Sequence, residues 1–192
     1  MMGGVMMETA MMKAVIGFVA LATATGAMAQ APDMGRFTMG PVFEDYGPAA
    51  DIAATMPIPE GATFRVAMDA AKQADEGVNL TLFSAARLIN MHAKAGLPVD
   101  ATQVAVVVHG KATLDLLNAE AYAARFDGAE NPNTALIAAL TDHGVRIILC
   151  GQSAAAQGVD ETNDLLPGVE VALSAMTAHA LLQADGYTLN PF

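Results

Sequence analysis

The segment Val104-Ala105-Val106-Val107-Val108 is an almost purely β-branched apolar run. Such runs are typical of strands buried on both faces, as in a parallel sheet that is covered by helices. Partial alternation predicts another strand at 63–68, and apolar runs bounded by turn residues predict two more. These strands lie at 63–68, 145–150 and 169–173. The central strands of the fold are therefore expected to have no solvated face.

Helical patterns separate the predicted strands. Within residues 80–95, Leu82, Ala86, Ile89 and Ala93 recur at spacings of four, three and four, which places them on one face of a helix. Further helices are predicted at 114–124, 131–143, 153–157 and 174–183. Strands and helices thus alternate four times, which predicts βαβ units. The expected fold is α/β, a three-layer sandwich with a mainly parallel sheet.

Three polar residues are interpreted as helix caps. Asn131 and Asn133 flank a proline that suits a first helical turn, and Ser174 precedes the last predicted helix. An alternative role for Ser174 is that of the nucleophile in a Ser/His hydrolase. No G-x-S-x-G elbow surrounds it, so capping explains it better.

Residues 1–29 have the layout of a signal peptide. Lys13 precedes the apolar stretch 14–22, and Ala27-Met28-Ala29 forms an A-x-A cleavage box. Glu8 is unfavourable in a positive leader, so residues 1–10 are interpreted as a mis-called start. We expect cleavage, a periplasmic location and no stable membrane anchor.

The mature chain is predicted to have two parts. Residues 30–61 hold five of the nine prolines and several glycines, which indicates an extended lead-in with little regular structure. Residues 62–192 form the predicted α/β domain. The chain is 54% apolar, which is enough for a well-buried core, and its formal net charge is -11. A surface this acidic repels nucleic-acid phosphates and anionic membranes, so no nucleic-acid partner is expected.

Cys150 is the only cysteine, and it closes the strand predicted at 145–150. Strand ends followed by a glycine turn and a helix are where open α/β sheets bind ligands. The turn Gly151-Gln152-Ser153 could aim backbone N–H groups at the sulfur and so favour the reactive thiolate. The alternative is a small buried hydrophobic residue, as most lone cysteines are.

His109, Cys150 and Ser174 each fall at the C-terminal end of a predicted strand, so all three are expected at one edge of the sheet. His109 could act as a base or donor, and Lys111 could hold an anion. Cys150 is the predicted catalytic residue, and His109, Lys111, Gln152 and Ser174 are supporting candidates. The sequence does not give the strand order that would make them neighbours. The histidines and the cysteine show no zinc spacing, so neither a metal nor another cofactor is predicted.

Several short motifs together resemble the DsrE/DsrF-like family, and most closely its exported branch. The resemblance spans about 63–192. It rests on His109-Gly110, Asn131-Pro132-Asn133, Cys150-Gly151-Gln152-Ser153, Pro167-Gly168-Val169, Ser174-Ala175-Met176-Thr177, and Leu182-Gln183 with Gly186-Tyr187.

The resemblance implies an α/β domain that assembles into homo-oligomers, often trimers or hexamers. Cytoplasmic relatives carry sulfur as a cysteine persulfide on a residue that ends a strand and precedes a short Ala-rich helix and a Gly-Val pair. Here Cys150, Ala154-Ala155-Ala156 and Gly158-Val159 have that layout. Where sulfur-relay relatives look basic before the glycine, this chain has Ala156-Gln157, which removes one route to a low thiol pKa.

Two hypotheses follow. The first is an exported sulfur-handling protein that carries sulfane sulfur on Cys150 and exchanges it with a thiol or sulfur-donor protein. The second is a non-catalytic homo-oligomer that binds a small ligand or serves as an accessory protein, in which Cys150 is only packing.

Overall fold

The structure is a computed structural model, and it describes residues 33–190. The predicted signal peptide, at 1–29, lies outside the described residues. Along the chain the elements are β1 (Phe37–Thr38), β2 (Ala49–Ala50), β3 (Phe64–Ala70), α1 (Leu80–Lys94), the 3-10 helix η1 (Val99–Ala101), β4 (Thr102–Val108), the 3-10 helix η2 (Gly110–Leu116), α2 (Ala119–Arg125), α3 (Thr134–Asp142), β5 (Arg146–Cys150), α4 (Gly151–Gln157), β6 (Val169–Ala172), α5 (Ala175–Ala184) and β7 (Thr188–Asn190).

The main sheet has five strands in the order β6-β5-β4-β3-β7, and every pair in it is parallel. Its middle strand is β4, whose residues Val104–Val108 are almost completely buried. The β-branched run therefore occupies the most enclosed position of the sheet, as its composition predicts. The predicted α/β fold with a mainly parallel sheet is confirmed.

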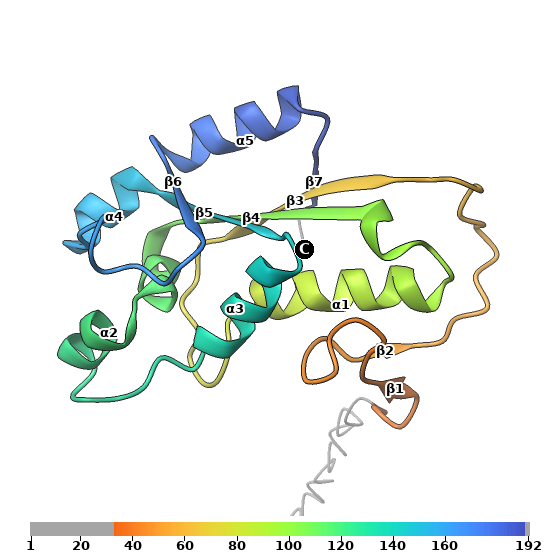
Figure 1. Ribbon diagram of the computed structural model, residues 1–192, viewed down its shortest axis with the longest axis horizontal. Helices are drawn as coiled ribbons and strands as arrows, with labels where there is room; N and C mark the ends of the chain where they lie inside the picture. The colour runs from red at the N-terminus through yellow and green to blue at the C-terminus, as the bar shows by residue number, and fades with distance from the viewer. Residues whose placement is uncertain (1–32, 191–192) are drawn as a thin grey trace, which may run out of the picture. The chain divides into compact units, whose positions relative to one another are not determined.

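Helices cover the two faces of this sheet unequally (Figure 1). One face packs on α1 and α3 through a large apolar cluster that includes Ile89, Val106 and Ile137. On the other face, α5 is the only covering helix of the described residues, with Val107 and Leu182 in a smaller cluster. α5 returns the chain from β6 at one edge of the sheet to β7 at the other. This return path, and β7 itself, were not predicted from the sequence.

The helix predicted at 114–124 is wrong as one element. The structure has η2 and then α2, with a break at Leu117, which forms an isolated antiparallel bridge with Leu165. The N–H of Asn118 donates to the Asp164 carbonyl at 2.7 Å, and its side chain caps α2. A contact with a distant segment therefore interrupts a stretch whose local pattern is helical throughout.

The capping role predicted for Asn133 is wrong, whereas Asn131 caps the turn that leads into α3. That helix begins at Thr134, and the Asn133 side chain makes no capping hydrogen bond. Asn131 Oδ1 accepts the N–H of Asn133 at 2.9 Å, the bond that an asparagine cap makes two residues ahead. Asn131 Nδ2 also donates to the carbonyls of Asp115 and Leu117, and Asn133 Oδ1 accepts the N–H of Asn79 at 2.7 Å. These amides thus satisfy buried backbone groups at the end of η2 and at the start of α1.

The lead-in packs on the domain through apolar contacts of Phe43 and through the buried side chain of Asn90. Asn90, on α1, accepts hydrogen bonds from the N–H groups of Val42 and Phe43 and donates to the carbonyls of Phe43, Tyr46 and Gly47. It is fully buried. Residues 42–47 are thus fixed on α1, and the short strands β1 and β2 pair beside them.

Within residues 33–190 no helix has the length and apolar character needed to span a membrane.

We expect Gly47→Ala to destabilise the protein by about 2–4 kcal/mol. Gly47 has φ +64, and a Cβ there would lie 2.3 Å from the backbone nitrogen of Arg87, so both backbone strain and a clash oppose it. Gly61→Ala is the matched control, because Gly61 has φ +71 and open space around it. That variant carries strain alone, about 1 kcal/mol. Urea unfolding measures both, and equal losses would contradict this packing.

Candidate functional site

Cys150 is the last residue of β5 and lies directly before α4, in register with Ala172 of β6. Gly151 begins the helix where a side chain would crowd β6, since a Cβ there would lie 3.0 Å from the Ala172 carbonyl oxygen. Cys150 is 5% exposed and belongs to neither apolar cluster. The residue is enclosed, but hydrocarbon does not surround its sulfur.

The Cys150 sulfur is surrounded by hydrogen-bond donors. Burial alone would raise the pKa of the thiol. Four hydrogen bonds oppose this effect of burial, one from the Ser153 hydroxyl and three from the backbone N–H groups of Ser153, Ala175 and Gln152. Because they outweigh burial, the pKa of the Cys150 thiol lies below its ordinary value. The donors come from the first turns of both α4 and α5. They stabilise the thiolate without any cation among them.

The Ser153 hydroxyl is itself oriented by a neighbouring strand end. Its oxygen accepts the N–H of Gly110 at 3.0 Å. With that lone pair occupied, the hydroxyl hydrogen is free to point at the sulfur, as a donor to a thiolate must. Gly110 has φ +56 and lies where a Cβ would come within 2.9 Å of the Ala71 carbonyl, so this close approach requires glycine. The β4–η2 turn therefore helps to stabilise the Cys150 thiolate indirectly, by orienting the Ser153 hydroxyl.

The register of the sheet places His109 beside Cys150. Val108 of β4 pairs with Leu149 of β5. His109 directly follows Val108, and Cys150 directly follows Leu149. Alternation along the strands puts both on the face covered by α5, because Val107 and Ile148, two residues earlier, lie in the apolar cluster on that face. The predicted meeting of strand ends at one edge is thus observed.

His109 belongs to a three-residue polar cluster. Its Nε2 lies 2.8 Å from Asp69 Oδ2, and His179 Nε2, on α5, lies 2.8 Å from Asp69 Oδ1. A carboxylate only accepts hydrogen bonds, so both imidazoles carry a hydrogen on Nε2. Burial would raise the pKa of Asp69, but the hydrogen bonds and charges of the two histidines outweigh it and lower that pKa. Asp69 is therefore a stable anion at neutral pH.

The other predicted candidates lie apart from the sulfur or touch it only through backbone. Lys111 is exposed on η2 and is not among the donors. Gln152 contributes its backbone N–H, while its side chain donates to the Leu173 carbonyl at 3.3 Å. Ser174 caps α5 by accepting the N–H of Thr177 at 3.1 Å, so the capping prediction is confirmed.

Sequence reasoning missed Ser153, Asp69 and His179 as functional side chains. Ser153 was part of the predicted turn, but only its backbone was considered. Asp69 directly follows the strand predicted at 63–68, so the strand-end rule that selected His109 would also have selected Asp69; the observed strand runs to Ala70. His179 gives no local signal, because its role depends on α5 crossing the sheet.

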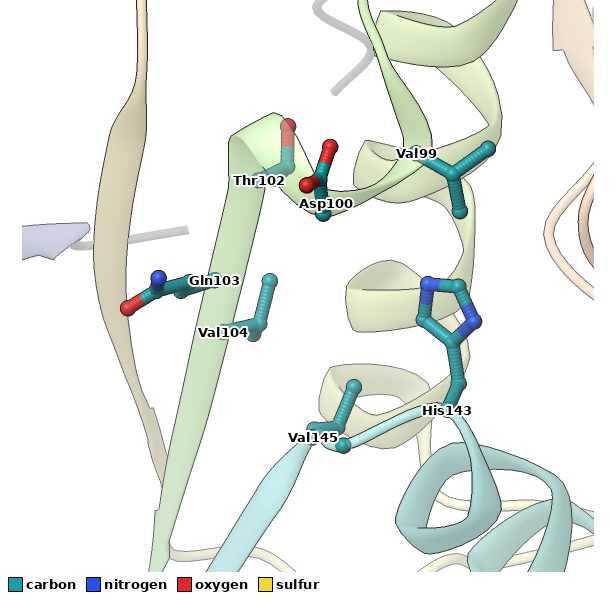
Figure 2. Close-up of a pocket in the computed structure, with 8 residues that line it drawn as sticks. Val99, Asp100, Thr102, Gln103, Val104, His143 and Val145 are labelled. Atoms are coloured by element: carbon teal, nitrogen blue, oxygen red, sulfur yellow. The ribbon is translucent and has the colours of Figure 1, made fainter.

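One pocket of the described residues adjoins the polar cluster, since Asp69 is among its lining residues. Another, of about 480 Å³, lies at the opposite end of the strands, where β4 and β5 begin, with Asp100 and His143 among its lining side chains (Figure 2). Burial lowers the pKa of His143 there. Within residues 33–190 no group of three or more His, Cys, Asp or Glu side chains could hold a metal ion.

Comparison with known proteins identifies the class. The DsrE/DsrF-like family matches residues 63–191, so the chain belongs to this family. Membership suggests a role related to sulfur relay. The fold is shared with MTH1491 from Methanobacterium thermoautotrophicum, solved as a protein of unknown function, at 22% identity and a TM-score of 0.51, covering 67% of this chain and 99% of that one.

A second solved structure, the ychN protein from E. coli, is 16% identical, with a TM-score of 0.49 over 68% of this chain and 100% of that one. No curated protein matches the chain. The family thus accounts for the fold and suggests a role related to sulfur relay, and the particular role has to be argued from the residues around Cys150.

We expect Ser153→Ala to raise the pKa of the Cys150 thiol by about half to one unit, the size of one lost hydrogen bond to a thiolate. The measurement is the pH dependence of alkylation by iodoacetamide, which has a single target because the chain has one cysteine. Ser84→Ala, on α1, is the control and leaves the midpoint unchanged. An unaltered midpoint in Ser153→Ala would show that its hydroxyl does not stabilise the sulfur.

Proposed function

We propose that this protein carries sulfane sulfur as a persulfide on Cys150 and passes it to a thiol. The observation that supports this most is the set of four donors around the sulfur, which lowers the thiol pKa while no cation takes part. Such a site favours the thiolate, the form that reacts with sulfane sulfur. The family's relation to sulfur relay agrees with this chemistry.

Uptake is an attack of the Cys150 thiolate on the outer sulfur of a donor persulfide. A new S–S bond forms to Cys150, and the S–S bond of the donor breaks. The donor leaves as its thiolate with that electron pair, and the outer sulfur keeps its hydrogen. No net oxidation occurs, so the step needs no oxidant.

Delivery is the reverse exchange with an acceptor. The acceptor thiolate attacks the outer sulfur of the Cys150 persulfide, and Cys150 leaves as a thiolate. Leaving is faster for a thiol of lower pKa. The donors from Ser153, Gln152 and Ala175 therefore assist delivery, because negative charge returns to the sulfur in that step.

One observation is equally compatible with the second hypothesis, a non-catalytic binding or accessory protein. Cys150 is only 5% exposed, which fits a packed residue as well as a sheltered thiol. The two readings differ in reactivity. A sheltered thiolate reacts readily with a small alkylating reagent at neutral pH, whereas a packing cysteine reacts slowly and can be replaced by alanine without effect on assembly.

The proposal is tested by intact mass after treatment of the full chain with polysulfide. We expect the wild-type protein to gain the mass of sulfur atoms, which dithiothreitol then removes, and Cys150→Ala to gain none. Cys150 provides the only thiol, so the gain is assigned without mapping. No gain in the wild-type protein, or an equal gain in Cys150→Ala, would refute the persulfide and leave the accessory role.

We also propose that the protein is exported to the periplasm and works as a homo-oligomer, a trimer or a hexamer. Export is supported by the leader at 1–29. Oligomerisation is supported by several apolar side chains that are exposed on the edge strand β6, on α5 and on the segment between them. These are Val171, Leu173, Met176 and Leu181, between 44% and 82% exposed.

We expect native mass spectrometry to give a multiple of the monomer mass, and Leu181→Glu to reduce it. Leu181, on α5, is 65% exposed, and a carboxylate there would be buried in an interface on this face. Leu80→Glu is the matched control on α1, since Leu80 is 78% exposed beside the other face of the sheet. A monomeric wild-type protein would refute the oligomer, and an unchanged mass in Leu181→Glu would place its interface elsewhere.

A further inference from the structure

The Asp69 carboxylate accepts hydrogen bonds from two different elements of the fold. One comes from His109 at the end of β4 and the other from His179 on α5, each at 2.8 Å and each to its own oxygen. Asp69 itself lies on β3. It is the point at which three separate parts of the chain are joined by side chains. The chemistry proposed above assigns no role to Asp69 or to His179.

Each histidine lies beside a donor of the Cys150 sulfur network. His109 immediately precedes Gly110, whose N–H orients the Ser153 hydroxyl at 3.0 Å. The backbone of His109 is also fixed, since its N–H donates to the Ala70 carbonyl at 2.8 Å. The His109–Asp69 bond therefore helps to set the position of the turn on which Ser153 depends.

His179 lies one helical turn after Ala175, whose N–H donates to the sulfur. α5 is the only helix on its face of the sheet within residues 33–190, and the apolar cluster beneath it is small. Its first turn is otherwise held by the Ser174 cap. The His179–Asp69 bond ties this turn to β3 and so fixes where the Ala175 N–H points.

We propose that Asp69 is a positioning residue for Cys150: by binding His109 and His179 it holds in place the two chain segments that supply and orient donors to the sulfur. This inference deepens the proposed function and rests on it for its biological use. Asp69 does not touch the sulfur; it acts through Ser153 and Ala175. Asp69, on β3, thus acts on the stability of a thiolate on β5, two strands away in the sheet.

Charge and positioning predict opposite effects of removing this carboxylate. A negative charge near a thiol disfavours the thiolate, so its loss alone would lower the thiol pKa. If the chain segments are no longer held in position, the hydrogen bonds to the sulfur weaken and the thiol pKa rises. The ionisable groups around Asp69 are His109 and His179, with Lys72, Asp75 and Glu76 lining a shared pocket. An upward shift in Asp69→Asn is therefore opposite in sign to the direct effect of the missing carboxylate charge.

The experiment is the pH dependence of iodoacetamide alkylation of Cys150 in the full chain. We expect the midpoint to rise by about half to one unit in Asp69→Asn and in His179→Ala, the size of one weakened hydrogen bond. His179→Gln keeps an N–H donor near the position of Nε2 and restores the wild-type midpoint. Asp185→Asn is the matched control, because Asp185 follows α5 but pairs with Arg65 at 3.4 Å, away from the sulfur.

An unchanged or lower midpoint in Asp69→Asn overturns the inference, as does a shift of equal size in Asp185→Asn. If His179→Ala does not fold, Asp69→Asn and His179→Gln decide the question. Sulfur uptake is measured separately by intact mass. Uptake by the wild-type protein with no shift in Asp69→Asn refutes the positioning role alone, whereas a shift without uptake refutes the persulfide alone.

Discussion

The parallel register of β3, β4 and β5 is the constraint on which the site depends. It aligns the ends of three strands on one edge, and alternation then turns Asp69, His109 and Cys150 to the same face. A slip of one residue in β4 would turn His109 to the opposite face and break its bond to Asp69. The two faces of β4 pack into different apolar clusters, with Val104, Val106 and Val108 in one and Ala105 and Val107 in the other, so the strand that builds the core also positions His109.

α5 connects the site to distant parts of the domain. It begins next to the sulfur, crosses the sheet and leads to β7, which pairs with β3 beside Asp69. One helix thus supplies the Ala175 donor, the His179 contact and most of the cover on its face. Because few apolar contacts hold it there, polar contacts to the sheet carry more weight than they would in a thick core.

What could be predicted from the sequence were the features with a local cause. The helix at 80–95 and the strand ending at Cys150 carry their own periodicity and stop signals, and both were found within one residue of their observed ends. The break at Leu117 and the amide contacts of Asn131 depend on partners far along the chain, which no local pattern contains. His179 was missed for the same reason, since its contact with Asp69 depends on the strand order and on the path of α5 across the sheet.

The absence of a basic residue before Gly158 looked like a loss of thiol activation, yet the structure supplies another route. Neutral donors from two helix starts and one hydroxyl stabilise the thiolate. A cation on the surface would be screened by salt and would attract anions of many kinds. Donors that are fixed in an enclosed site are not screened in this way, and they select for a group small enough to enter. A sulfur atom held in such a site is both protected between exchanges and a good leaving group during them, which are the two properties a carrier needs.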